Sequence, residues 1–159
     1  MKILKIRDVM VKDVITVNAD FTVKHAVEIM CRCGIGCLLV TEGEKAVGIL
    51  TERDILSRVV AKEKNPGKTF VGEIMSTPII VIGPEASPED AVKLMFRHRI
   101  KKLPVVEEGF SGARLVGLVT LTDIARMQPK LLEMLRELFA ELGEAPPKSM
   151  EKVIQYYIV

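Results

Sequence analysis

The pattern Gly-x-x-Thr-x-x-Asp occurs twice in the chain, at residues 48–54 and 117–123. In both copies Thr stands three residues before Asp, as Thr51 before Asp54 and as Thr120 before Asp123. This is the spacing of a capping box, in which the two side chains bond amides at the start of a helix. The same helix start attracts a phosphate, and the carboxylate can accept hydrogen bonds from ribose hydroxyls. The motif therefore predicts a structural cap and is also compatible with a nucleotide cradle.

The two motifs belong to a longer internal repeat. Residues 6–43 align with 71–108 at an offset of 65, and after a four-residue insertion residues 47–57 align with 116–126 at an offset of 69. The copies share 15 identities in 49 aligned positions, whereas a chance match for this composition would give about three. Since two copies are too few for a solenoid, we expect the pair to close on itself around a shared core.

The elements that must position the motifs follow the same order in each copy, and they predict an α+β fold of two β-α-β-β-α repeats. Short β-branched runs at residues 14–17 and 79–82 predict strands, and helices are expected to start at Thr22 and Ser87. Pro88 at the first helical position strengthens the second start. Residues 35–40 and 103–106 are expected to form hairpins with residues 47–50 and 115–119.

The domain boundaries follow from the repeat. We assign residues 1–62 to the first repeat, 63–70 to a polar linker, 71–128 to the second repeat and 129–159 to a C-terminal helix and tail. The C-terminal helix should start at Pro129 and end near Gly143, with a broad apolar face that packs on its own domain or on another subunit. Residues 150–159 are apolar enough to add a strand to a sheet edge in the same or another subunit.

Composition excludes several classes of protein. The 159 residues are 48% apolar and 28% charged, which argues against disordered, collagen-like and disulfide-scaffold chains. The net charge of +2 comes from interspersed signs and is poor support for a nucleic-acid surface. No apolar run approaches the roughly 20 residues of a membrane-spanning helix, and charges interrupt any signal-peptide core. We expect a soluble cytoplasmic protein that does not enter the membrane.

The other candidate chemical groups favour structural roles. Cys31, Cys33 and Cys37 are odd in number and lie within seven positions, which suggests a reducing compartment and does not match the paired C-x-x-C spacing of a zinc ribbon. His25 and His98 have no evident nucleophilic partner in sequence, and no P-loop, G-x-G-x-x-G or H-E-x-x-H motif occurs. We therefore expect no catalytic residues, no metal site and no required cofactor.

The chain resembles a tandem pair of CBS (cystathionine β-synthase) domains, the arrangement called a Bateman module. The resemblance rests on the repeat order, the paired DVM and EIM starts, the KKLPVV segment, and the VGILTERDI and VGLVTLTDI segments, and it covers about residues 3–127. It implies two repeats packed sheet to sheet about a pseudo-twofold axis. It also implies two clefts for adenosine-containing ligands such as AMP, ADP, ATP or S-adenosylmethionine, and a homodimer that is either parallel or antiparallel.

The resemblance also implies which residues line the clefts. Asp54 and Asp123 would hold the ribose, with Thr51 and Thr120 near ribose or phosphate. In such pairs the opening segment of one copy lines the adenine slot of the other. The residues implied for these slots are Met10 and Ile15 beside Thr120 and Asp123, and Met75 and Ile80 beside Thr51 and Asp54.

The two implied clefts differ in charge. Lys101 and Lys102 match the basic positions that face phosphates in similar proteins, whereas the first copy has Gly36 and Cys37 there. We expect the cleft with the two lysines to prefer phosphorylated ligands. The other cleft could be empty, could hold an uncharged adenosine or could rely on Arg53. A solvated strand edge is the alternative interpretation of the two lysines.

These observations lead to three hypotheses of function. The first is a non-catalytic adenine-nucleotide sensor that passes its ligand state to a separate protein. The second is a protein or nucleic-acid interaction module that docks through the C-terminal helix and tail. The third, a small nucleotide-processing enzyme, lacks a visible base and metal set. Thr and Asp would read the ribose common to all adenosine compounds, so the exact ligand stays open.

Overall fold

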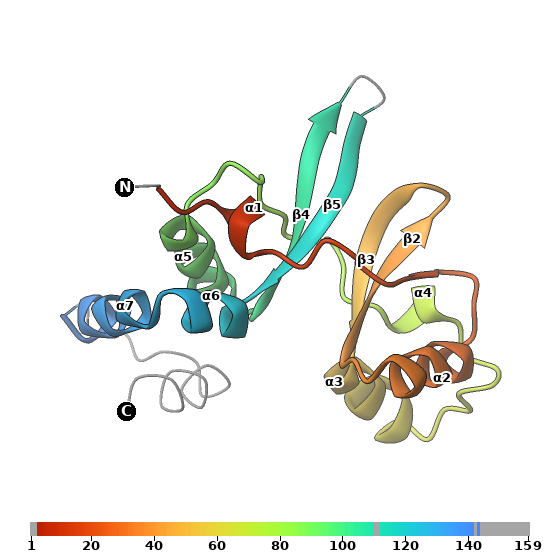
Figure 1. Ribbon diagram of the computed structural model, residues 1–159. Coiled ribbons are helices and arrows are strands. Elements are labelled where there is room, and N and C mark those ends of the chain that lie inside the picture. Colours follow the sequence, from red (N-terminus) through yellow and green to blue (C-terminus); the bar gives the residue numbers. More distant parts are fainter. Residues whose placement is uncertain (1–2, 110–111, 142, 144–159) are drawn as a thin grey trace. The chain divides into compact units, whose positions relative to one another are not determined.

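The computed structural model describes residues 3–109, 112–141 and 143, which form two compact units (Figure 1). The first-repeat unit comprises Asp13–Ile80 and Glu108–Leu115. The second-repeat unit comprises the described parts of Met1–Lys12, Val81–Glu107 and Val116–Val159. Each unit is named for the repeat that supplies its first long helix and most of its strands.

The first-repeat unit is built on a three-stranded sheet of order β1-β2-β3. Strand β1 runs parallel to β2, and β2 pairs with β3 as an antiparallel hairpin. Helix α2 begins after Thr22, whose side chain accepts a hydrogen bond from the His25 amide at 3.3 Å, and ends at Gly34 in the left-handed conformation. The elements of this unit are β1 (Thr16–Asn18), α2 (Val23–Cys33), β2 (Cys37–Glu42), β3 (Lys45–Thr51), α3 (Glu52–Ile55), the π-helix η1 (Leu56–Val60) and α4 (Val71–Ile74).

The core of this unit forms where α2 and α4 pack on β2 and β3. Helix α2 buries Val23, Ala26 and Met30, which recur at three- and four-residue spacing and so share one face of the helix. These side chains meet the apolar residues of the hairpin and of α4, namely Leu38, Val40, Leu50, Val71 and Ile74. The hydrophobic effect therefore holds α2 and α4 against the hairpin that ends at Thr51.

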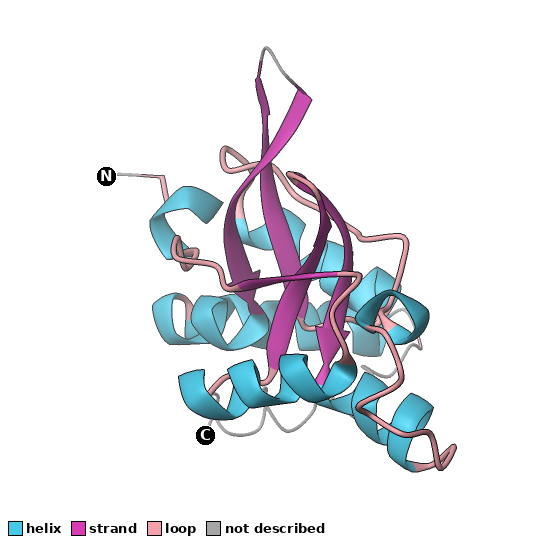
Figure 2. Ribbon diagram, turned by 90° about the vertical axis from the view of Figure 1, so that its right-hand side faces the viewer, coloured by secondary structure: helices cyan, strands magenta, loops and turns pink. Residues whose placement is uncertain are grey.

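The second-repeat unit repeats the helix, hairpin and helix. Ser87 caps α5 by accepting a hydrogen bond from the Asp90 amide at 3.1 Å, with Pro88 at the first helical position. The two strands of the hairpin twist about each other (Figure 2). The elements are α1 (Ile6–Val9), α5 (Pro88–His98), β4 (Lys102–Gly109), β5 (Gly112–Thr120), α6 (Leu121–Met127) and α7 (Pro129–Glu141), and residues 108–115 of the hairpin group with the first-repeat unit.

The two expected opening strands differ in extent. The first begins at Thr16, two residues later than expected, and the run 79–82 forms only a single parallel bridge between Ile82 and Val105. In the first repeat, the Ala19 amide donates to the Thr41 carbonyl at 2.9 Å and extends the pairing. Pro84 occupies the equivalent position in the second repeat and has no amide hydrogen, so the ladder stops there.

The opening segments of the two repeats are exchanged between the units. In the second-repeat unit, the Ile6 amide at the start of α1 donates to the Ala86 carbonyl at 3.0 Å. In the first-repeat unit, the Val71 amide at the start of α4 donates to the Phe21 carbonyl at 2.8 Å. These bonds join equivalent positions of the alignment, so each compact unit combines the body of one repeat with the opening segment of the other.

The C-terminal helix α7 packs on its own unit. It contacts α5 and α6 and buries Leu131, Leu132 and Leu135, whereas Met134 is 65% exposed. The helix begins at Pro129, as the sequence predicts. The expected apolar residue Leu142 and the expected strand at 150–159 lie outside the described residues. Packing on its own domain is thus observed for this helix.

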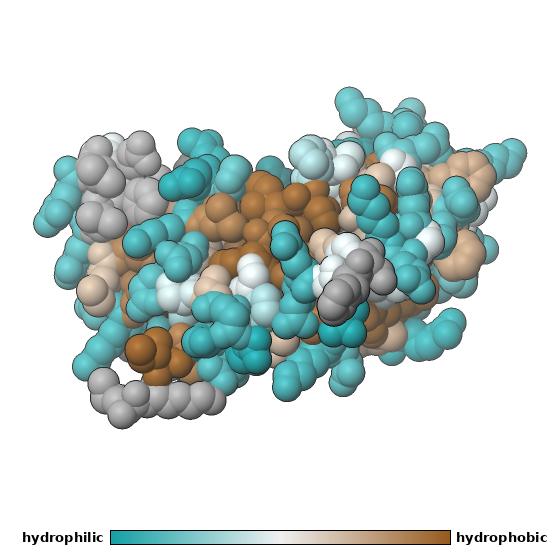
Figure 3. Space-filling model, turned by 90° about the horizontal axis from the view of Figure 1, so that it is seen from above, coloured by the Kyte–Doolittle hydropathy of each residue, from teal (hydrophilic) through white to brown (hydrophobic). Residues whose placement is uncertain are grey.

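The exterior is mixed in character. Hydrophilic side chains are spread over the visible face and are interrupted by apolar patches (Figure 3). Among the described residues, no helix has both the length and the apolar character that crossing a membrane requires.

Candidate functional site

Each Gly-x-x-Thr-x-x-Asp motif forms the predicted capping box. In the first, Asp54 Oδ2 accepts from the Thr51 amide at 2.9 Å and from Thr51 Oγ1 at 3.0 Å, while Thr51 Oγ1 accepts from the Asp54 amide at 3.3 Å. In the second, Asp123 Oδ2 accepts from the Thr120 amide at 3.0 Å and from Thr120 Oγ1 at 2.6 Å. Both caps use one carboxylate oxygen, which leaves the other oxygen of each Asp for a further partner.

A methionine from the opening segment of the other repeat lies on the glycine of each motif. A Cβ atom at Gly117 would lie 2.5 Å from Met10 Sδ, and one at Gly48 would lie 2.5 Å from Met75 Sδ. A side chain at either glycine would displace the thioether and press on a backbone carbonyl oxygen, that of Val11 at 3.0 Å from a Cβ at Gly117 and that of Ser76 at 3.1 Å from a Cβ at Gly48. The structure thus brings Met10 into the unit of the Thr120 motif and Met75 into the unit of the Thr51 motif.

The two isoleucines implied for the adenine slots are placed differently. Ile80 is half-buried and lies in the first-repeat unit, together with Thr51 and Asp54. Ile15 is 38% exposed and also lies in the first-repeat unit, where its carbonyl accepts from the Leu39 amide at 3.4 Å. No contact within the second-repeat unit therefore brings Ile15 to its implied partners, and its role there stays a prediction.

The lysine pair lies at the start of α6. The Leu121 amide, at the first residue of this helix, donates to the Lys101 carbonyl at 2.8 Å, and Lys102 is the first residue of β4. The Lys101 residue is exposed and Lys102 is half-buried. The backbone of this lysine pair thus lies beside the second helix start.

The equivalent place in the first repeat carries a carboxylate. The Glu52 amide donates to the Gly36 carbonyl at 3.1 Å, and a Cβ atom at Gly36 would lie 3.2 Å from Glu52 Oε1. Arg53 is exposed beside it. The residues at this place therefore carry more positive charge in the second repeat, with Lys101 and Lys102, than in the first.

The second oxygen of Asp54 is already bonded in the first-repeat unit. Asp54 Oδ1 accepts from Ser76 Oγ at 2.9 Å and lies 3.4 Å from Arg58 Nη1, and the residue is only 6% exposed. Arg58 Nη1 also donates to the carbonyls of Ile74 at 2.7 Å and Met75 at 3.0 Å. Sequence reasoning missed Ser76 and Arg58 as members of this site.

The second oxygen of Asp123 has no such partners. Across residues 3–109, 112–141 and 143, no side chain or amide donates to Asp123 Oδ1. In the alignment, Val11 of the second-repeat unit matches Ser76 of the first-repeat unit, and Met127 matches Arg58. This pair of differences was the signal in the sequence that distinguishes the two carboxylates.

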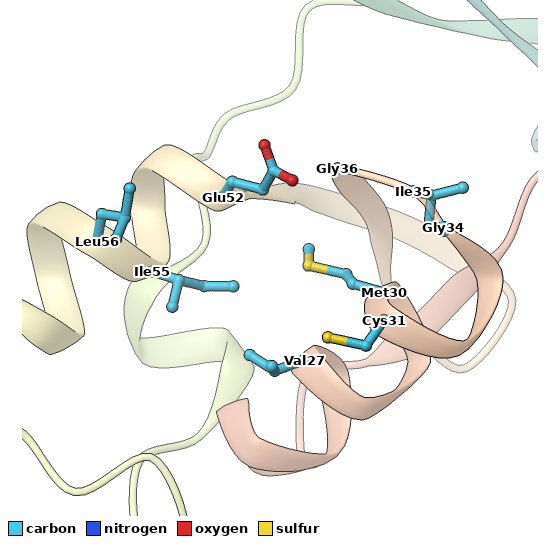
Figure 4. Close-up of a pocket in the computed structure, with 9 residues that line it drawn as sticks. All are labelled: Val27, Met30, Cys31, Gly34, Ile35, Gly36, Glu52, Ile55 and Leu56. Atoms are coloured by element: carbon cyan, nitrogen blue, oxygen red, sulfur yellow. The ribbon is translucent and has the colours of Figure 1, made fainter.

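An apolar hollow of about 530 Å³ lies between α2 and α3 of the first-repeat unit (Figure 4). It is lined by Val27, Met30, Cys31, Gly34, Ile35, Gly36, Glu52, Ile55 and Leu56. In the second repeat, Phe96 replaces Cys31, Leu121 replaces Glu52, both are buried, and α7 contacts α5 and α6. The first repeat therefore has smaller or more polar residues at these positions. Within its described part, the first-repeat unit also has no helix that corresponds to α7.

The cysteines and histidines form no clustered site in the described part of the chain. Cys31 and Cys33 are exposed free thiols, and Cys37 is half-buried. The described residues contain no group of three or more His, Cys, Asp or Glu side chains that could hold a metal ion. The His25 ring packs edge-on against Phe21, with ring centroids 4.8 Å apart.

Comparison with known proteins places these features in a family. The family model of the CBS domain matches residues 6–61 and 71–130. The CBS domain-containing protein YhcV of Bacillus subtilis is 38% identical over 120 residues, covering 76% of this chain and 82% of that protein. The inosine-5'-monophosphate dehydrogenase of Korarchaeum cryptofilum is 40% identical over 114 residues, covering 72% of this chain but 22% of that enzyme.

Solved structures share the same fold. The CBS domain pair of protein MJ0100, in complex with 5'-methylthioadenosine and S-adenosyl-L-methionine, aligns with a TM-score of 0.70 and 28% identity. The alignment covers 81% of this chain and 98% of that one. The expected α+β fold of two repeats is confirmed by this similarity. With its two matched repeats, its paired capping motifs and its exchanged opening segments, the chain belongs to the CBS domain family.

Proposed function

We propose that this CBS pair is a regulatory module that binds an adenosine-containing ligand such as AMP, ADP, ATP or S-adenosylmethionine. The observation that carries the proposal is Asp123 Oδ1, which accepts no hydrogen bond from the residues that the structure describes, beside the hydroxyl of Thr120. A carboxylate oxygen with open lone pairs accepts the two hydroxyls of a ribose, and ionised acceptors make the stronger hydrogen bonds. All adenosine compounds carry this diol, so the site would recognise the part that these ligands share.

The surroundings of Asp123 suit the other parts of such a ligand. Met10 lies against Gly117 in the same unit, and a polarizable thioether packs favourably against an aromatic base. The Lys101 and Lys102 side chains supply cationic charge near the start of α6 for phosphates. We therefore expect this site to prefer phosphorylated adenosine compounds, with Ile15 as a further lining residue.

Regulation follows from binding to one arrangement of the chain better than to another. A ligand shifts a conformational equilibrium only by its difference in affinity for the two states. We propose that the bound state is passed to a separate protein in the cytoplasm, through a homodimer and without catalysis. The match to the dehydrogenase covers 22% of that enzyme, and we carry no activity over from it.

The relative with bound ligands supports the choice of ligand class. The CBS pair of MJ0100 holds 5'-methylthioadenosine and S-adenosyl-L-methionine, both adenosine compounds. Docking of a protein or nucleic acid through the C-terminal helix is less favoured. The Leu131, Leu132 and Leu135 side chains of α7 are already buried in the second-repeat unit.

The test is calorimetric titration of ligand-stripped protein with AMP, ATP, S-adenosylmethionine and NAD. We expect saturable binding of at least one adenosine compound, and loss of about tenfold to a hundredfold in affinity for Asp123→Asn, because a charged acceptor is replaced by a neutral amide. The Asp20→Asn variant, at an exposed residue in the first-repeat unit, is the matched control and should bind as the wild type does. Absence of binding by all four compounds would overturn the proposal.

A further inference from the structure

We propose that Ser76 and Arg58 close the first-repeat site, so that the chain binds one adenosine ligand, at Asp123. This inference rests on the proposed function and goes further, because it names the residues that make the two sites unequal. The family motif is present in both repeats, and the difference arises from side chains outside the motif. The two sites therefore differ in whether the Asp carboxylate is available to bind a ribose.

The two carboxylates, of Asp54 and Asp123, differ in the number of lone pairs that are available to a ligand. An ionised carboxylate has about four lone-pair positions. Asp54 accepts three hydrogen bonds, from the Thr51 amide and hydroxyl on Oδ2 and from Ser76 Oγ on Oδ1, and Oδ1 also forms an ion pair with Arg58 Nη1 at 3.4 Å. A ribose diol that approached Asp54 would have to displace Ser76 and Arg58. Within the described part of the chain, Asp123 receives two donors, both from Thr120, which leaves two positions for a diol.

The two closing residues are themselves held in place. Ser76 pairs with Ile49 of β3 through both backbone bonds, at 2.8 and 3.0 Å. Arg58 reaches the site from η1 and bonds the carbonyls of Ile74 and Met75 with the same nitrogen that faces Asp54. Moving the Arg58 side chain breaks two hydrogen bonds and the ion pair with the 6% exposed Asp54, and moving the Ser76 side chain breaks its hydrogen bond to the same carboxylate.

The second-repeat unit has apolar side chains at both equivalent positions. Val11 pairs with Leu118 of β5 through both backbone bonds, at 2.9 Å each, just as Ser76 pairs with Ile49. The backbone arrangement is thus the same, but Val11 has no hydroxyl to donate. Met127, at the position of Arg58, is the last residue of α6, is 54% exposed and has no donor. The two repeats therefore differ in donors and not in backbone pairing.

An exchange of these residues tests the inference. Titration with AMP should saturate at one molecule per wild-type chain. The double variant Arg58→Met with Ser76→Val, which copies the second-repeat unit, should raise this number to two. Adding Asp54→Asn to that double variant should return it to one. The reverse exchange, Met127→Arg with Val11→Ser, should weaken AMP binding at the remaining site by at least tenfold.

A measurement without ligand separates this inference from the proposed function. In urea denaturation of ligand-free protein, a double-mutant cycle of Asp54→Asn and Arg58→Met should show coupling, since the two residues contact each other. The matched cycle of Asp123→Asn and Met127→Leu should show none. Two AMP molecules on the wild type, or no coupling in the first cycle, would overturn the inference. Absence of binding by AMP, ATP, S-adenosylmethionine and NAD with coupling intact would overturn the proposed ligand site and leave the closing contact established.

Discussion

The sulfur of Met10 occupies the space that a side chain at Gly117 would need. A Cβ atom at this glycine would lie 2.5 Å from Met10 Sδ and 3.0 Å from the Val11 carbonyl oxygen. Because Met10 belongs to the opening segment of the first repeat and Gly117 to the hairpin of the second, this contact joins the exchanged segment to the candidate site. The contact is repeated between Met75 and Gly48.

Substitution of Gly117 by Ala should displace the opening segment. We expect Gly117→Ala to lower the free energy of unfolding by about 1–3 kcal/mol, the usual cost of overpacking, and to weaken adenosine-ligand binding. Urea denaturation and calorimetry measure the two effects. The control is Gly83→Ala, in the same unit, where a Cβ atom meets nothing within 4 Å. Equal stability of the two variants would contradict the close packing at Gly117.

The hydroxyl of Thr120 should serve both the cap and the ligand. Thr120→Ala removes the acceptor for the Asp123 amide and should cost about 0.5–2 kcal/mol of stability. Thr120→Ser keeps a hydroxyl and should retain most of the stability and the binding. Thermal melting with and without AMP separates the two roles, because the cap affects both conditions and ligand contact only one. A Thr120→Ala variant as stable as the wild type would contradict a stabilising role of the cap.

The Lys101 and Lys102 pair should select for phosphate. Changing both to Ala should weaken binding of ATP more than binding of adenosine, and the difference should shrink at high salt because ions screen exposed charges. Titrations at low and high salt measure this. Lys130→Ala, at an exposed lysine near the start of α7, is the control. An equal loss of affinity for ATP and adenosine would favour a positioning role of the strand over a charge effect.

Filling the hollow beside Cys31 should stabilise the first-repeat unit. Cys31→Phe copies Phe96 of the second repeat and should add about 1 kcal/mol of stability if roughly 40 Å² more apolar surface leaves water. Cys33→Phe, on the same helix but outside the lining of the hollow, should give no gain. The comparison of melting temperatures decides. A loss of stability for Cys31→Phe would mean that the hollow is too small for the ring.

The packing of α7 on its own unit can be tested at one buried leucine and one exposed methionine. Leu132 is fully buried and Met134 is 65% exposed. Leu132→Ala should cost about 2–5 kcal/mol, the usual range for a buried leucine, whereas Met134→Ala should change stability little. Denaturation at several protein concentrations measures both. A cost for Leu132→Ala that depended on protein concentration would point to burial against another subunit.

Several features could be predicted from the sequence because they depend on residues close together in the chain. The helix starts at Thr22 and Ser87 follow from cap chemistry within one turn, and the two Thr-x-x-Asp boxes follow from a spacing of three. The expected strand at 79–82 was wrong in extent. Pro84 lacks an amide hydrogen, which is evident from the sequence. That this shortens the strand became clear only from the structure, where the equivalent Ala19 amide pairs with Thr41.

The hydrogen-bond partners of the Asp54 and Asp123 carboxylates depend on contacts between residues that are distant in the sequence. The sequence by itself determined the duplication, the capping boxes and the cationic character of the second site, since alignment and local spacing are one-dimensional properties. Only the tertiary structure decided that Ser76, 22 residues from Asp54, donates to its second oxygen and that Arg58 lies against the same atom. A hydrogen bond requires two atoms to meet in space, and the fold brings those atoms together.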